Sequence, residues 1–167
     1  MVYNVKGGVS ETPKAASTLR RRKGVCENFA SVFTDIVSKS GIPAFTRTGY
    51  TNVSGNIKRS GHSWSAVQLN NEWLLCDPTW DAGGSNHTNW FLISPSQFIE
   101  THMPFDPLWQ LLPQPISQKE FDRGNYFKQK DLPVWNIADS IEHFLQLDSL
   151  QQLEASARRM HQAGIEN

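Results

Sequence analysis

The sequence predicts an α+β fold, in which an amphipathic helix packs on an antiparallel β-sheet and further helices follow at the C-terminal end. Strand-like runs cover 43–50, 62–69 and 72–80, with side chains that alternate in polarity. Helix-capping signals return after Asp131. The helix is predicted from Cys26 onward because apolar residues recur there with a period of 3.6, at Phe29, Ala30, Phe33, Ile36 and Val37.

The composition excludes several classes of protein. The chain has 167 residues, with 16 basic and 16 acidic side chains, so no excess charge favours nucleic acid or an anionic membrane as partner. No apolar run approaches the roughly 20 residues of a membrane span, and Met1 opens no signal-peptide pattern. Two cysteines cannot make a disulfide scaffold, and they leave the compartment undecided.

A short helix is expected from Pro13 to about Arg22, because Thr12-Pro13 combines a capping residue with proline at the first helical position. It ends in a basic run, which is typical of a solvated helix terminus and alternatively suits a substrate anion. Gly24-Val25 then separates it from the helix that begins at Cys26. The basic run is Arg20, Arg21, Arg22 and Lys23.

The register of a β-hairpin follows from Asn70-Asn71, which is read as a two-residue turn. His62 then lies diagonal to Asp77 on one face, whereas Cys76 points to the opposite face. A Cys26–Cys76 disulfide is disfavoured for the same reason. The facing pairs are Leu69 with Glu72, Ala66 with Leu75, and Trp64 with Asp77, so Trp64 is expected to shield the His–Asp pair from water.

The remaining segments carry weaker signals. We expect loops at 51–61 and 81–89, a short strand at 90–94 and a helical turn at 95–99. An irregular aromatic segment should follow at 102–112. The polar connection at 114–130 should contain some helix around 117–122. Two C-terminal helices are predicted, one capped by Asp139-Ser140 and one by Ser149 with Gln152. The second should bury an apolar face that comprises Leu150, Leu153, Ala157 and Met160.

Three residues form a candidate catalytic group. A cysteine at a helix start meets unpaired N–H groups and the positive end of the helix dipole, which favour the thiolate and can hold an oxyanion. His62 could take the thiol proton, and Asp77 could orient the imidazole. The alternative is a small buried cysteine next to an unrelated histidine. The coincidence of Cys26 with a His–Asp pair on one face makes catalysis as well supported as that alternative.

Several linked motifs resemble the transglutaminase-like superfamily, over roughly Ala15 to Asp81. In chain order they are Gly24-Val25-Cys26-Glu27-Asn28-Phe29-Ala30, Gly41-Ile42-Pro43-Ala44, Gly49-Tyr50, Gly61-His62-Ser63-Trp64, Trp73 and Asp77-Pro78-Thr79-Trp80. A further likeness, to the kyphoscoliosis-peptidase branch, rests on His102-Met103-Pro104, Trp109-Gln110-Leu111-Leu112 and Trp80-Asp81.

The resemblance implies a papain-like α+β fold with the nucleophile helix on an antiparallel sheet. It also implies acyl transfer through a thioester, with Cys26 as nucleophile, His62 as general base and acid, and Asp77 as orienter. Related enzymes usually supply a second oxyanion donor and a helix upstream of the cysteine. Either Tyr3 serves as that donor, or the first helix of the family is missing. The expected organisation is a catalytic domain over 1–130 and a helical extension over 131–167, which packs on it or begins a further domain.

The predicted function is hydrolysis of peptide or isopeptide amides by a cysteine enzyme, with a protein or peptide substrate. The alternatives are a cross-linking transglutaminase and a catalytically silent binding module. No cofactor is expected. A zinc site is disfavoured because Cys26, Cys76, His62, His87 and His102 include no closely spaced ligand pair. Cys76 is expected to serve packing, and His102 is expected to be structural.

Overall fold

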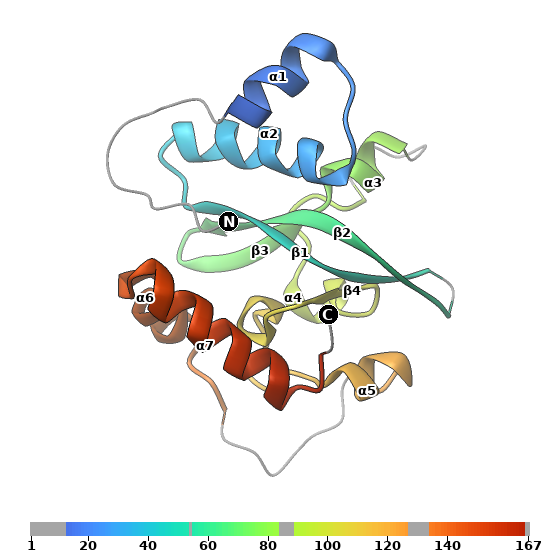
Figure 1. Cartoon of the computed structure of the whole chain (residues 1–167), viewed down its shortest axis with the longest axis vertical. Helices are drawn as coiled ribbons and strands as arrows, with labels where there is room; N and C mark the ends of the chain where they lie inside the picture. Colours follow the sequence, from blue (N-terminus) through green and yellow to red (C-terminus); the bar gives the residue numbers. More distant parts are fainter. Residues whose placement is uncertain (1–12, 54, 84–88, 127–133, 166–167) are drawn as a thin grey trace. The chain divides into compact units, whose positions relative to one another are not determined.

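The computed structural model describes residues 13–53, 55–83, 89–126 and 134–165 (Figure 1). Its elements, in chain order, are α1 (Pro13–Arg21), α2 (Cys26–Lys39), β1 (Ala44–Val53), β2 (Asn56–Leu69), β3 (Glu72–Cys76), α3 (Pro78–Gly83), α4 (Pro95–Phe98), β4 (His102–Pro104), the 3₁₀ helix η1 (Pro107–Gln110), α5 (Gln118–Asp122), α6 (Ile137–Gln146) and α7 (Ser149–Gln162). None of the helices in these ranges is long and apolar enough to cross a membrane.

The predicted α+β class is confirmed by four strands in one sheet, with hydrogen-bonded order β3-β2-β1-β4. The chain divides into two compact units. Unit 1 comprises Met1–Thr48 and His62–Ser94, and unit 2 comprises Gly49–Gly61 and Pro95–Asn167. These units follow compactness alone, so the expected domain boundary at residue 130 stays a prediction.

In unit 1 the β2–β3 hairpin has the predicted register. Leu69 faces Glu72, Ala66 faces Leu75, and Ser65 faces Cys76. Asn70 and Asn71 both have positive φ, 50° and 65°. Two successive left-handed residues are what a two-residue type I′ turn requires, and asparagine tolerates this conformation better than most residues. The turn thereby sets which side chains share a face as far as the end of β3.

Helix α2 packs on one face of this hairpin. The Ser65 hydroxyl donates to the carbonyl of Ala30 at 3.3 Å and lies 3.0 Å from Thr34 Oγ1. Further along α2, Ser38 Oγ donates to the Ala44 carbonyl at 3.4 Å. The apolar part of the contact joins Ala44, Val67 and Cys76 of the sheet to Phe33 and Val37 of the helix.

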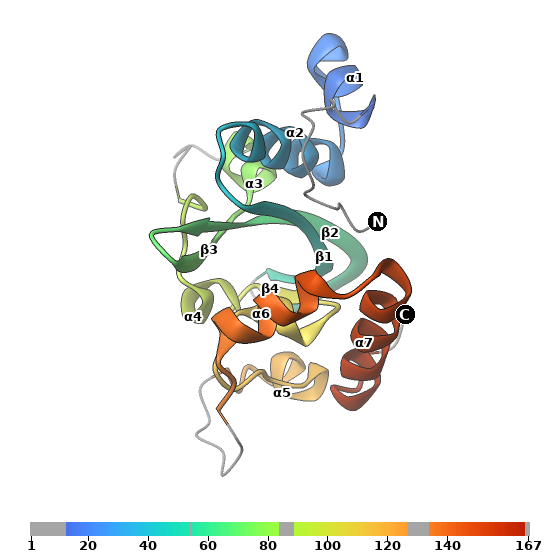
Figure 2. The same ribbon diagram turned by 90° about the vertical axis from the view of Figure 1, so that its left-hand side faces the viewer.

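These contacts also give the direction of α2 relative to β2. Ser38 donates to the carbonyl of Ala44, and the carbonyl of the preceding Pro43 accepts from Gln68 N. Ser38 therefore lies near the end of β2. Ala30 instead meets Ser65, nearer the middle of β2. Helix and strand therefore run the same way, and the first turn of α2 lies toward the half of β2 that contains His62. Figure 1 shows α3 beside this end of α2, and α2 and α3 are in contact (Figure 2 shows the same elements from the side).

Two predicted boundaries in unit 1 are wrong. The strand expected over 72–80 ends at Cys76, and α3 begins at Pro78, because aspartate followed by proline starts a helix better than it continues a strand. The strand expected over 90–94 is a single bridge between Ile93 and Leu75. Leu92 has φ 56°, a left-handed conformation that interrupts an extended strand.

The loop expected over 51–61 is also wrong. β1 continues to Val53 and β2 already begins at Asn56, with a tight turn at Gly55, where φ is 81°. Polar composition suggested a loop, but Thr51 and Asn52 are buried. The strands therefore extend through this polar sequence, because tertiary contacts override its weak strand propensity.

Unit 2 is built on the end of β1, which pairs antiparallel with β4: Gly49 faces Pro104 and Thr51 faces His102. A side chain at position 49 would collide with the Met103 carbonyl, so this approach requires glycine. The helix expected near 117–122 is α5, capped by Ser117. The core of the unit comprises Tyr50, Ile99, Met103, Leu112, Ile116, Phe121 and Ile165.

The C-terminal helices pack within unit 2. Arg159 of α7 makes two hydrogen bonds of 2.7 Å to the carboxylate of Asp106, which caps η1. Both predicted caps are displaced: Asn136 caps α6, and Asp148 caps α7. The predicted apolar face of α7 is wrong at Leu150 and Leu153, which are each 65% exposed while Gln152 is buried, but Met160 does pack against the core of unit 2.

Gln152 explains that reversal of faces. Its side-chain amide donates to the carbonyls of Phe144 and Leu147, at 3.1 and 3.0 Å, and so ties α7 to the end of α6. The last carbonyls of a helix lack N–H donors from a following turn, so the amide of Gln152 supplies donors here, in addition to Leu147 N, which donates to the Phe144 carbonyl at 3.3 Å. The Arg159–Asp106 pair holds the same side of α7 against η1. Polar bonds therefore decide which face of α7 is buried.

Candidate active site

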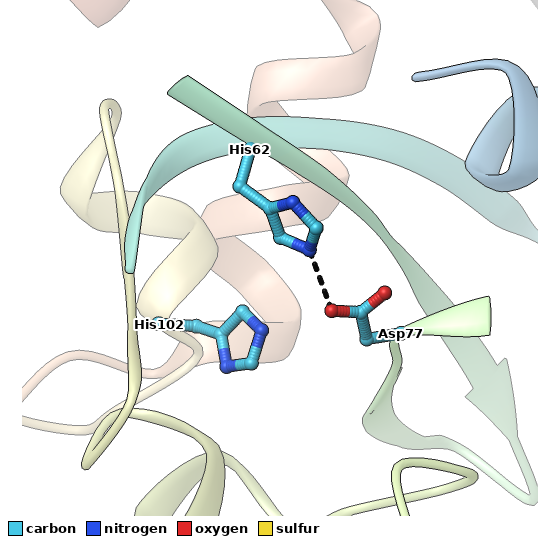
Figure 3. Close-up of side chains that lie close together, drawn as sticks. All are labelled: His62, Asp77 and His102. Carbon is cyan, nitrogen blue, oxygen red and sulfur yellow. Dashed lines mark hydrogen bonds and ion pairs between the residues drawn. The ribbon is translucent and has the colours of Figure 1, made fainter. Parts of the chain in front are cut away.

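The centre of the candidate site is a hydrogen-bonded pair on adjacent strands. His62 Nε2 lies 2.6 Å from Asp77 Oδ2 (Figure 3). The Asp77 side chain is fully buried, whereas 13% of the His62 side chain is exposed. Both residues belong to unit 1, and the hairpin register brings them together as the sequence predicts. A buried carboxylate beside an imidazole can orient the ring and stabilise its protonated form.

Asp77 has a second function, as the cap of α3. Its other oxygen, Oδ1, accepts from the backbone N–H groups of Thr79 and Trp80, at 2.9 and 3.1 Å. Pro78 occupies the first helical position, where its missing N–H costs nothing. The carboxylate is thus held by the start of α3 on one oxygen and faces His62 with the other. Sequence reasoning missed this role, although Asp-Pro is a recognisable signal for it.

Two tryptophans enclose the imidazole of His62. Trp64, which is fully buried, has its ring centroid 6.2 Å from that of His62. Trp80, on the first turn of α3, lies 5.7 Å from it and packs edge-on against Trp90. Trp73 packs against Phe45 and belongs to the core. The pair of rings explains why the His–Asp hydrogen bond is shielded from water.

Cys26 is the first residue of α2 and is half-buried. The backbone before it is held by Asn28, whose Oδ1 accepts from Val25 N at 2.9 Å. A Cβ at Gly24 would lie 2.5 Å from the Asn28 Cβ, so only glycine fits there without displacing Asn28. Asn28 N bonds back to the Val25 carbonyl at 2.9 Å, and the positive end of the helix dipole at this turn can face an anion. Sequence reasoning also missed the role of Asn28.

Cys76 lies in a different environment. It faces Ser65 on the helix-covered side of the hairpin, where it packs with Val67. Burial raises the pKa of its thiol to about 11, although the N–H of Leu92 donates to Sγ at 3.3 Å and opposes that shift. A thiol with this pKa stays protonated near neutral pH and is a poor nucleophile. Both cysteines are free thiols.

The sequence also singled out His102, Tyr3 and His87. His102, also drawn in Figure 3, belongs to unit 2; its ring stacks on Phe98 at 3.9 Å, and Thr101 Oγ1 lies 2.8 Å from Nδ1. These contacts give His102 a packing role. Tyr3 and His87 lie outside the described residues. The catalytic roles of Cys26, His62 and Asp77 and the absence of a cofactor stay predictions.

Comparisons with a family model and with individual proteins agree on one family. A model described as the transglutaminase-like superfamily matches residues 2–78. The chain is 32% identical to kyphoscoliosis peptidase of Mus musculus and 33% identical to that of Homo sapiens. Each alignment is 133 residues long and covers 70% of this chain. It is 25% identical to Lim and transglutaminase domain protein ltd-1 of Caenorhabditis elegans over 63% of its length. The chain spans 20%, 20% and 18% of these relatives, respectively, so they are much longer proteins.

Proposed function

Since this chain carries a domain of the transglutaminase-like superfamily, we propose that it hydrolyses peptide or isopeptide amide bonds through a thioester on Cys26. The observation that carries the proposal is the 2.6 Å contact between His62 Nε2 and a fully buried Asp77, in the same unit as Cys26. Such a pair stabilises the imidazolium that forms when a thiol loses its proton to histidine. The relatives named peptidases support the hydrolytic outcome.

The proposed reaction starts with proton transfer from Cys26 Sγ to His62 Nδ1, the ring nitrogen that does not face Asp77. The thiolate then attacks the carbonyl carbon of the amide and forms a C–S bond. The negative oxygen of the tetrahedral intermediate accepts hydrogen bonds from N–H groups at the start of α2. When the C–N bond breaks, the leaving amine takes the proton from His62, and a thioester remains.

Water completes the proposed cycle. His62 removes one proton from water as the oxygen attacks the thioester, and the C–S bond then breaks. The sulfur leaves as a thiolate, and the His62 proton restores either the thiol or the ion pair. The products are a carboxylic acid and an amine, which together contain the atoms of the amide and one water. An amine that replaced water at this stage would yield a cross-linked product.

Alkylation of Cys26 tests the proposal without a known substrate. Iodoacetamide should label Cys26 selectively between about pH 5 and 9, with a rate at acidic pH far above that of a thiol with a pKa of about 8.5. In His62→Ala the labelling at about pH 6 should fall at least tenfold, because the thiolate loses its imidazolium partner. A wild-type rate that follows an ordinary thiol would contradict the proposal. Peptide-bond cleavage compared with incorporation of a labelled amine separates hydrolysis from transfer.

A further inference from the structure

A basic pocket lies where α1 ends and α2 begins. It encloses about 580 Å³, which falls in the range of ligand-binding pockets. All of it belongs to unit 1. Its lining includes two cationic side chains, two hydroxyl groups and an amide, but no acidic residue. The residues that matter for its chemistry are Ser17, Thr18, Arg21, Lys23, Val25 and Asn28.

Two charged side chains, both cationic, line this pocket. Arg21 and Lys23 are exposed and form no ion pair with any residue in the described part of the chain. Arg21 is at the C-terminus of α1, where a cation interacts favourably with the helix dipole. That interaction explains a basic helix end. It does not explain why Lys23, beyond the helix, lines the same pocket together with Val25 and Asn28.

The pocket directly adjoins the proposed nucleophile. Val25 precedes Cys26 in the chain, and its N–H is held by the Asn28 side chain, so both lining residues belong to the turn that carries the thiol. An extended peptide advances by about 3.3–3.6 Å per residue. A residue one or two positions from an amide bound at Cys26 would therefore reach the pocket with its side chain.

We propose that this pocket binds an acidic side chain of the peptide substrate, with Arg21 and Lys23 as the residues that determine this specificity. The inference rests on the proposed function of Cys26. Ser17, Thr18 and Asn28 supply hydrogen-bonding groups for the carboxylate, and the first turn of α2 adds its positive end. Peptides with Glu or Asp near the scissile amide are thus preferred over those with Gln or Asn.

The chain offers a matched control for the test. Arg21→Gln/Lys23→Gln removes two positive charges from the pocket, and Arg20→Gln/Arg22→Gln removes two from the same basic run outside the lining. All four side chains are exposed, so neither double variant should unfold the protein. The net charge of both variants is identical. Only a local site can therefore respond differently to them.

Binding is measured first, in a Cys26→Ala background that cannot turn over. Fluorescence anisotropy compares two labelled peptides that differ only in Glu against Gln at the residues around a central amide. The Glu peptide should bind about fivefold more tightly, the difference expected from two exposed charge pairs, and added salt should reduce it. Arg21→Gln/Lys23→Gln should abolish this preference, whereas Arg20→Gln/Arg22→Gln should keep it.

Three results would overturn the inference. The protein could show no preference for the Glu peptide, or both double variants could lose that preference equally. Inorganic phosphate could also displace the Glu peptide at equal ionic strength, which would indicate a general anion site.

The reactivity of Cys26 gives a second readout, measured with the thiol present. Iodoacetate should lose rate relative to iodoacetamide, by about threefold, in the pocket variant alone. If Cys26 is unreactive while the Glu peptide still binds selectively, the catalytic proposal fails and the proposed specificity of the pocket is retained. If instead the pocket shows no specificity, the rapid labelling of Cys26 by iodoacetamide is unaffected, so the two failures can be distinguished.

Discussion

The start of α2 and the end of β3 each carry one cysteine, and the two differ in every property that governs thiol chemistry. Cys26 is half-buried and is the first residue of helix α2. Cys76 is 2% exposed, and burial raises its pKa. We therefore expect the reactivity of each thiol to depend on its position on a secondary-structure element. The following predictions test this contrast, from the largest expected effect to the smallest.

The largest effect is expected at Asp77, the residue after Cys76. Asp77→Ala should lower the free energy of unfolding by about 2–4 kcal/mol, because it leaves His62 and two N–H groups of α3 without their buried partner. It should also lower Cys26 alkylation at about pH 6 at least tenfold. Urea denaturation and mass spectrometry measure the two quantities.

Asp77→Asn provides the matched control. Asparagine is also a good helix cap, so it should retain most of the stability that alanine loses. It cannot stabilise an imidazolium by charge, so alkylation of Cys26 should still fall about tenfold. If Asn preserved full reactivity, Asp77 would be only a structural cap.

The next effect concerns pH. The pKa of Cys76 is about 11 in the folded protein and 9.0 for the ordinary thiol. Below about pH 9 the thiol is protonated in both the folded and the unfolded chain, and its contribution to the free energy of unfolding is fully present. Between about pH 9 and 11 only the unfolded chain loses the proton, so the free energy of unfolding falls by up to about 2–3 kcal/mol. Urea denaturation across this range should show a smaller loss in Cys76→Ala. An equal loss in both proteins would assign the alkaline transition to other groups.

Substitution by serine should lower stability at Cys76 and abolish rapid thiol labelling at Cys26. Cys76→Ser buries a hydroxyl in an apolar contact and should cost about 1–2 kcal/mol of stability. Cys26→Ser should change stability by less than about 0.5 kcal/mol yet remove all rapid labelling. In wild type, Cys76 should react with iodoacetamide only after denaturation. Labelling of native Cys76 at about pH 8 would contradict its assigned burial.

The smallest effect is expected at the turn before Cys26. Gly24→Ala places a Cβ against Asn28 and should weaken its bond to Val25 N, at a cost of about 1 kcal/mol. The rate of Cys26 labelling should fall a few-fold. Asn28→Ala removes the same hydrogen bond without the collision, so a similar rate in both variants would assign the effect to the cap. An unchanged rate in Gly24→Ala would show that the turn does not position the thiol.

Local signals in the sequence determined the helix at Cys26, the hairpin register and the contact between His62 and Asp77. The helix follows from a period of 3.6 over a long segment, and the register follows from a two-residue turn with side chains that alternate strictly. The family motifs in turn predicted the fold class. Such features depend on neighbours in the chain, so they can be predicted without knowledge of distant contacts.

Only the tertiary structure decided the remaining features. Leu150 and Leu153 form an apolar row, yet α7 buries Gln152 instead, because its amide satisfies the end of α6, while the half-buried Arg159 pairs with Asp106. The polar sequence after Tyr50 became strand because it packs in unit 2. Polar groups that become buried must find partners, and those partners lie far away in the sequence. Periodicity cannot identify them.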